Sequence, residues 1–132
     1  MKDYYVYLAI FEYTENGIGI YFPDLPGAVS FAENEEEAFK AAKECLELHL
    51  YGMEEEKEEI PAPCKIKDIK LEENEVPVLI KAFMKSIRDE MQNKLIKKTL
   101  TIPKWINDLA VRKKINFSQV LQEALKDKLE VL

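Results

Sequence analysis

The chain has 132 residues, of which 47% are apolar and 33% are charged. This composition excludes an intrinsically disordered protein, and the length allows one medium domain or two small ones rather than a large multi-part enzyme. No apolar run approaches the roughly 20 residues that a membrane span needs, and the N-terminal stretch lacks the pattern of a signal peptide. We therefore expect a cytoplasmic protein without membrane contact, in which Cys45 and Cys64 are reduced and buried.

Charge divides the chain into an acidic part and a basic part. Residues 1–83 carry 8 lysines, no arginine and 19 acidic residues, which gives a net charge of -11. Residues 84–132 carry 9 lysines, 2 arginines and 6 acidic residues, which gives +5. This asymmetry suggests two partners, a nucleic acid for the basic part and a basic protein for the acidic part. Alternatively, the acidic surface only keeps the protein in solution.

The acidic part predicts three strands, a helix and a fourth strand. Strands are expected over residues 4–13 and 18–22, on either side of the hairpin signal Asn16-Gly17. A proline-rich turn follows, and then a third strand over residues 28–32. Asn34 can cap a helix whose apolar stripe ends at Gly52. After a charged loop over residues 54–59, the last strand is predicted over residues 76–84. The expected order is thus β-β-β-α-β, in a protein of the α+β class.

The basic part predicts a linker, a short strand and two helices. Residues 84–96 are mixed and polar, so we expect a linker with at most one helical turn. Residues 97–102 alternate between polar and apolar side chains like a strand, and Pro103 ends it. Apolar stripes then indicate one helix around Trp105, which we expect in the core, and a second helix after a turn at residues 115–118.

Residues 97–132 are too few to fold alone. A single strand leaves its N–H and C=O groups without partners, and so small a unit buries too little apolar surface. Both problems are solved if two chains pair their strands antiparallel and interlock their helices. The strings KKTLTIPKWINDLA and NFSQVLQEAL resemble the ribbon-helix-helix family, which has this arrangement. We therefore expect a homodimer, or a higher even-numbered homo-oligomer, that forms through residues 97–132.

The resemblance implies a DNA-binding face on this unit. If Leu100 and Ile102 point into the shared core, Lys97, Thr99 and Thr101 point the other way, and in this family the ribbon lies in the DNA major groove. The start of the second helix would meet a backbone phosphate through Asn116, Ser118 and Gln119. Weaker backbone contacts would come from the remaining basic side chains, Lys98, Lys104, Arg112, Lys113 and Lys114. The alternative is a dimerisation module that binds no DNA.

The whole chain resembles the HicB antitoxins. The resemblance rests on the turn Phe22-Pro23-Asp24-Leu25-Pro26-Gly27, on the helix EEAFKAAKECLELHL and on the ribbon-helix-helix string that follows. It implies a partial RNase H-like fold for residues 1–83, and a HicA-type ribonuclease toxin as the partner that this domain blocks. It also implies that residues 97–132 repress the chain's own operon by binding operator DNA. For the toxin contact we expect the turn, at Phe22, Pro23, Asp24 and Leu25.

Two other functions stay open at this point. A nuclease of the RNase H type needs carboxylates that converge on two metal ions. The candidate carboxylates are scattered along the chain: Asp3, Glu12, Asp24, Asp68 and Glu72. None of them lies at the centre of the first strand. The lone His49 is more typical of a buried structural histidine than of a catalyst. We therefore expect no enzyme activity, no metal and no cofactor. The remaining alternative is a stand-alone repressor whose first domain senses a ligand or another partner.

Overall fold

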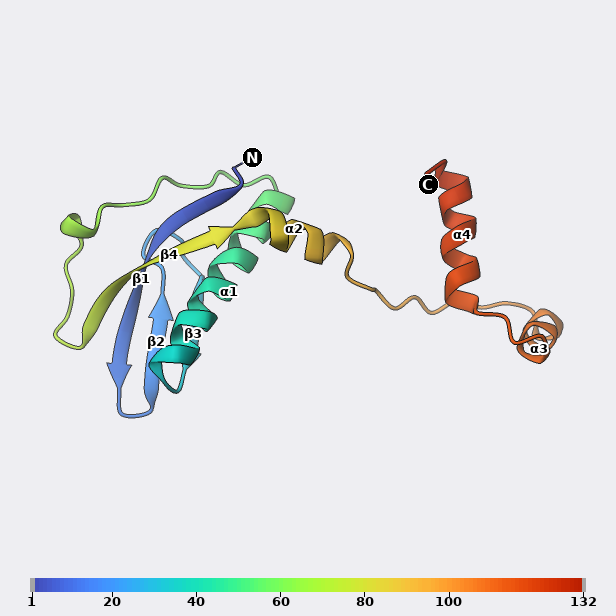
Figure 1. Ribbon diagram of the computed structural model, residues 1–132, viewed down its shortest axis with the longest axis horizontal. Helices are drawn as coiled ribbons and strands as arrows, with labels where there is room; N and C mark the ends of the chain where they lie inside the picture. The colour runs from blue at the N-terminus through green and yellow to red at the C-terminus, as the bar shows by residue number, and fades with distance from the viewer. Residues whose placement is uncertain (1, 132) are drawn as a thin grey trace. The chain divides into compact units, whose positions relative to one another are not determined.

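The computed structural model describes residues 2–131, which form two compact units, the first up to Lys94 and the second from Leu95 onward. The first unit contains a four-stranded sheet and two helices, and the second contains two helices (Figure 1). The elements of the first unit are β1 Tyr4–Thr14, β2 Gly17–Tyr21, β3 Val29–Ala32, α1 Glu35–Glu55, a short 3-10 helix Ile66–Asp68, β4 Glu75–Phe83 and α2 Met84–Gln92. Those of the second are α3 Lys104–Arg112 and α4 Phe117–Leu129. The α+β class and the β-β-β-α-β order are confirmed.

The sheet is antiparallel throughout, in the order β3-β2-β1-β4. The predicted hairpin joins β1 and β2, but its turn lies one residue earlier than expected, at Glu15 and Asn16, so that Thr14 pairs with Gly17. Gly17 has a φ of +143°, and a Cβ there would lie 2.5 Å from the Ala32 carbonyl oxygen. The close approach of β3 therefore requires a glycine at this position.

Helix α1 lies against one face of the sheet and forms the core with it (Figure 1). As predicted, Asn34 caps the helix, because its side-chain oxygen accepts a hydrogen bond of 2.9 Å from the Glu37 amide. The helix buries one residue in every turn: Ala38, Ala42, Leu46 and Leu50. Alternate strand residues meet this stripe from the sheet, among them Tyr7, Ala9, Phe11, Ile18, Ile20, Ile80 and Ala82.

The helix does not end at Gly52, contrary to the prediction. It continues to Glu55, so part of the expected charged loop is helical. No atom lies within 4 Å of a Cβ built on Gly52, and its φ is not positive, so nothing at this position ends the helix. Met53 packs against the core one residue later, and this packing outweighs the roughly 1 kcal/mol that a glycine costs inside a helix.

The linker predicted over residues 84–96 is wrong for its larger part. Residues 84–92 form helix α2, in which Met84 and Ile87 are buried in the core of the first unit and Met91 packs against it. These three side chains recur at helical spacing, which brings them to one side of the helix. The first unit therefore extends beyond Phe83, where the prediction ended it, and includes α2.

Candidate interaction surfaces

The proline-rich turn between β2 and β3 is held together by its own backbone. The Leu25 amide donates to the Phe22 carbonyl at 3.0 Å, and the Ala28 amide donates to the Leu25 carbonyl at 3.0 Å. Gly27 has a φ of +93°, a conformation that favours glycine. Phe22, Leu25 and Ala28 are buried in the core, so the turn is a rigid part of the first unit.

The structure separates the four predicted toxin-contact residues into two kinds. The side chains of Phe22 and Leu25 are no more than 2% exposed, so they serve the core and offer no surface to a partner. Pro23 is exposed. Asp24 is half-buried, and its Oδ2 accepts a hydrogen bond of 2.9 Å from the Cys64 amide, which ties the turn to the connection between α1 and β4. Of the four predicted residues, Pro23 has the most accessible side chain, and Asp24 is already engaged within the chain.

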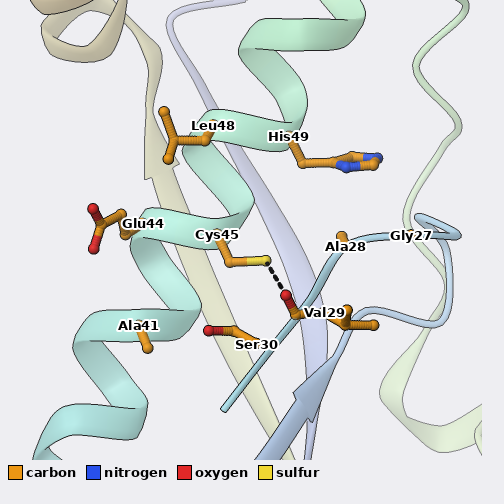
Figure 2. Close-up of a pocket in the computed structure, with 9 residues that line it drawn as sticks. All are labelled: Gly27, Ala28, Val29, Ser30, Ala41, Glu44, Cys45, Leu48 and His49. Atoms are coloured by element: carbon orange, nitrogen blue, oxygen red, sulfur yellow. Dashed lines mark hydrogen bonds between the residues drawn. The ribbon is translucent and has the colours of Figure 1, made fainter. Parts of the chain in front are cut away.

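A groove of about 450 Å³ runs beside this turn, between β3 and α1. Figure 2 shows Cys45 pointing from α1 toward the Val29 carbonyl, to which its Sγ donates at 3.5 Å, and His49 reaching over Gly27 and Ala28. Burial raises the pKa of the Cys45 thiol, which keeps it protonated near neutral pH and therefore weakly nucleophilic. The groove thus has the residue types of a cysteine–histidine pair without an activated thiolate.

Both cysteines are free thiols, but neither is fully buried as predicted. Cys64 lies on the irregular connection, where burial and the neighbouring Asp24 carboxylate raise the pKa of its thiol. His49 is half-buried rather than enclosed in the core. Within residues 2–131 no three histidine, cysteine or acidic side chains stand close enough to hold a metal ion. The described helices also include none that is long and apolar enough to cross a membrane.

The second unit has no core of its own. None of its described residues is buried, and the apolar side chains of α3 and α4 are largely exposed. Trp105, which was expected in a core, is 66% exposed in the single chain. An apolar groove of about 590 Å³ lies between the two helices and the residues before them. Its apolar lining includes Leu100, Ile102, Ile106, Phe117, Val120 and Leu121.

Residues 97–102 belong to no helix or strand in the single chain. Every second residue of this segment, Lys98, Leu100 and Ile102, lines the groove. This is the alternation that the sequence predicts for a strand, and it separates Lys98 from Lys97, Thr99 and Thr101. The side chains of Lys97, Thr99 and Thr101 are exposed. The strand itself stays a prediction, because its pairing partner would be a second chain.

The start of α4 has a side-chain cap. Asn116 caps the helix, and its side-chain oxygen accepts a hydrogen bond of 3.1 Å from the Gln119 amide. Since that amide is engaged, the helix start offers the amides of Phe117 and Ser118 to an anion. The Gln119 side chain is directed along the helix, with its Nε2 3.4 Å from Glu123 Oε1.

The predicted backbone-contact residues are exposed and lie around the two helices. Lys104 forms an ion pair of 2.7 Å with Asp108, one turn along α3, and both side chains are exposed. Such a pair contributes little to stability, so the lysine remains available to a phosphate. Arg112 ends α3, Lys113 follows it as the C-cap, and Lys114 has a φ of 56° in the turn before α4. The turn between the helices therefore carries three successive basic residues, Arg112, Lys113 and Lys114, which we call the basic corner.

Comparison with known proteins agrees with this architecture. The model of the HicB-like antitoxins of bacterial toxin–antitoxin systems matches residues 5–124. A structure of a toxin–antitoxin complex from Streptococcus pneumoniae superposes with a TM-score of 0.62 at 26% identity, covering 95% of this chain and 99% of the other. The antitoxin HicB of Burkholderia pseudomallei shares the fold, with a TM-score of 0.51 at 18% identity over 96% of this chain and 98% of the other.

Two further comparisons complete the picture. A HicA3 and HicB3 toxin–antitoxin complex aligns with a TM-score of 0.49 at 24% identity, covering 58% of this chain and 95% of the other. No curated protein sequence matches the chain. The family match spans both units, from β1 into α4. The chain belongs to the HicB-like antitoxins of bacterial toxin–antitoxin systems.

Proposed function

We propose that the chain binds and inhibits a HicA-type mRNA-cleaving toxin through its first unit and represses its own operon through its second. The observation that carries this proposal is the coincidence of charge and structure. Counted by structural unit, the net charge is -10 for residues 1–94 and +4 for residues 95–132. An acidic unit attracts an RNA-binding toxin, while a basic unit attracts DNA. The HicB-like family and the complex from Streptococcus pneumoniae support the toxin partner.

For the second unit we propose a ribbon-helix-helix dimer. Its support is the apolar groove, whose lining would be covered by the same groove of a second chain. Residues 97–102 would then pair with their equivalents and present Lys97, Thr99 and Thr101 to the major groove. The amides at the start of α4 and the basic corner between the helices would hold the phosphates. For the first unit, the β-β-β-α-β order is the basis for proposing a partial RNase H-like fold that acts as a binding module and not as an enzyme.

The toxin partner is tested by purifying the tagged full chain from its native cells at moderate salt and identifying every bound species by mass. We expect a stoichiometric small basic protein that cleaves RNA once it is separated from the chain. Adding the purified chain back should suppress the cleavage. If the preparation contains no such protein and the chain still binds operator DNA, the function would be that of a stand-alone repressor rather than an antitoxin.

The DNA-binding face is tested with the double variant Thr99→Ala, Thr101→Ala. Each base contact that is lost should weaken binding to the DNA upstream of the chain's own gene by about 1–3 kcal/mol, because each threonine hydroxyl would meet a base edge. Fluorescence anisotropy measures the affinity, and sedimentation checks that the dimer persists. Thr14→Ala is the matched control, since that threonine lies in the hairpin of the first unit and bonds only the Gly17 carbonyl. Equal affinities for both variants would rule out readout by this face.

A further inference from the structure

One face of the sheet carries no helix. In an antiparallel sheet, paired residues point to the same side, so the register identifies this face residue by residue. Tyr4 and Val6 of β1 pair with Phe83 and Lys81 of β4, while Leu8 pairs with Leu79. Along the opposite edge of β1, which pairs with β2, Ile10 pairs with Tyr21. Tyr21 in turn pairs with Val29 of β3, so all these residues lie on the same face of the sheet. We call this surface the outer sheet face, and its large exposed apolar side chains are Tyr4, Val6, Val29, Phe31, Leu79 and Phe83.

The outer sheet face has buried side chains at its centre and exposed apolar side chains around them. Leu8 and Ile10 are at most 1% exposed, although neither belongs to the core cluster under α1. On the same face, the side chains of Tyr4, Phe31 and Leu79 are each 54% exposed. Large apolar side chains scattered singly over a surface are ordinary, but six on one face of one sheet are typical of a binding surface.

A hydrogen bond across β1 fixes one end of this face. Tyr21 on β2 donates to Glu75 Oε2 on β4 at 2.6 Å, and these two strands flank β1. The bond spans the position of Ile10, which explains the complete burial of that side chain although no helix covers it. The same carboxylate accepts the Glu72 amide at 2.8 Å. This end of the face is therefore preformed, and a partner that binds here has little ordering cost.

Carboxylates border the same end of the face. Glu12 pairs with Glu75 in the register, and the chain adds three more acidic residues at the adjoining turns, Glu15, Glu72 and Glu73. We call these five residues the acidic rim. The pKa of Tyr21 is raised to about 12 by its hydrogen bond to Glu75, by burial and by the charges of Glu75, Glu12 and Glu72, so these carboxylates stand near its hydroxyl. At the other end of the face, Lys81 Nζ lies 4.5 Å from the centre of the Tyr4 ring.

The charge decides between a second copy of the chain and a different protein as the occupant. If two copies of the chain met through this face, their first units, each of net charge -10 and each with its own acidic rim, would lie against one another. Like charges across an interface are costly, whereas a basic partner gains from the same rim. An apolar centre beside a charged border is also the usual composition of a protein–protein interface.

We propose that the outer sheet face, bordered by the acidic rim, is the surface on which the basic toxin partner docks. This inference rests on the proposed antitoxin function and assigns it a surface other than the turn at residues 22–25. The toxin would place apolar side chains over Leu79, Val6 and Phe31, and lysine or arginine side chains against the acidic rim.

The test compares Leu79→Asp with Phe39→Asp in the full chain, with the basic protein that co-purifies with the wild-type chain as the probe. Phe39 is the matched control, because it is 56% exposed and lies on α1, away from the outer sheet face. Titration calorimetry should show the toxin bound at least about 30-fold more weakly by Leu79→Asp, the effect of losing one central contact of an interface. Phe39→Asp should bind within a few-fold of wild type.

A second pair of variants tests the acidic rim without touching any apolar side chain. Glu73→Lys should slow association with the toxin by about tenfold at low salt and by less at high salt, since exposed charges act on the association rate and are screened. Glu59→Lys, on the connection after α1, is the control of equal charge. This pair also decides the question if Leu79→Asp proves unfolded by circular dichroism.

Each result has one meaning. If Leu79→Asp and Glu73→Lys bind the toxin like wild type, the docking surface lies elsewhere and the antitoxin function stands. If Leu79→Asp keeps the toxin but lowers the mass of the chain's own assembly in sedimentation, the face joins two copies and the proposal is wrong. If the wild-type chain captures no basic protein, the proposed function fails, and this inference fails with it.

Discussion

If the second unit pairs as proposed, a chain that carries Val120→Asp is expected to be monomeric at micromolar concentrations at which the wild-type chain is a dimer. Val120 lines the apolar groove and is 51% exposed in the single chain, so a buried position for it requires a second copy. A charge placed there stays unpaired in the shared core. In a two-fold dimer each substitution occurs twice, and a loss of about 2 kcal/mol at each copy weakens pairing roughly 1,000-fold.

Val111→Asp provides the matched control. This valine is 58% exposed on α3 and does not line the groove, so the same substitution should leave the dimer intact. Sedimentation velocity measures the mass of both variants at equal concentration. Operator binding should fall together with pairing, because a single unit presents only half of the two-stranded ribbon. A dimeric Val120→Asp chain would contradict the pairing through this groove.

Local signals were sufficient to predict the four strands of the first unit and helix α1. Asn34, followed by three glutamates, indicates a helix start, and the structure shows the cap. The hairpin between β1 and β2 is also correct, although its turn is displaced by one residue. The displacement arises because Gly17 is needed where β3 comes close, which is a tertiary requirement that the Asn16-Gly17 pair does not reveal.

The errors have a common physical cause, which is packing between segments distant in sequence. Met84, Ile87 and Met91 carry a helical stripe, but the charges between them make the segment resemble a linker until the core that receives the stripe is known. The burial of side chains in the proline-rich turn was also not visible in the sequence. Phe22 and Leu25 lie in a proline-rich turn typical of a surface, yet both side chains are buried.

The outer sheet face was missed for a related reason. Residues 4–11 of β1 are apolar without interruption, so the period of two that would separate the faces is not visible in the sequence. Only the pairing of β1 with β2 and β4 shows that Leu8 and Ile10 point away from α1. The second unit shows the reverse case, since alternation over residues 97–102 is visible in the sequence and reappears in the lining of the groove.

Arg88→Met is expected to destabilise the first unit by about 1–3 kcal/mol, the cost of leaving a largely shielded polar group without its partner. Arg88 lies on α2 and donates two hydrogen bonds to the Glu54 carboxylate of α1, from Nε at 2.9 Å and from Nη2 at 2.6 Å. The same Nη2 donates to the Lys2 carbonyl at 2.6 Å. The Glu54 side chain is only 6% exposed, so without the arginine its carboxylate stays shielded from water and unpaired. Urea denaturation of the full chain measures the loss.

The double variant Arg88→Met, Glu54→Gln separates the charge from the packing. If the cost comes from an unpaired carboxylate, replacing it with a neutral amide should recover more than half of the lost free energy of unfolding. The matched control is Lys104→Met, which breaks the exposed pair with Asp108 and should change stability by less than about 1 kcal/mol. A double variant as unstable as Arg88→Met alone would assign the cost to lost packing instead. Because α2 is the last helix before the second unit, this ion pair also fixes where the connection between the two proposed partner-binding units begins.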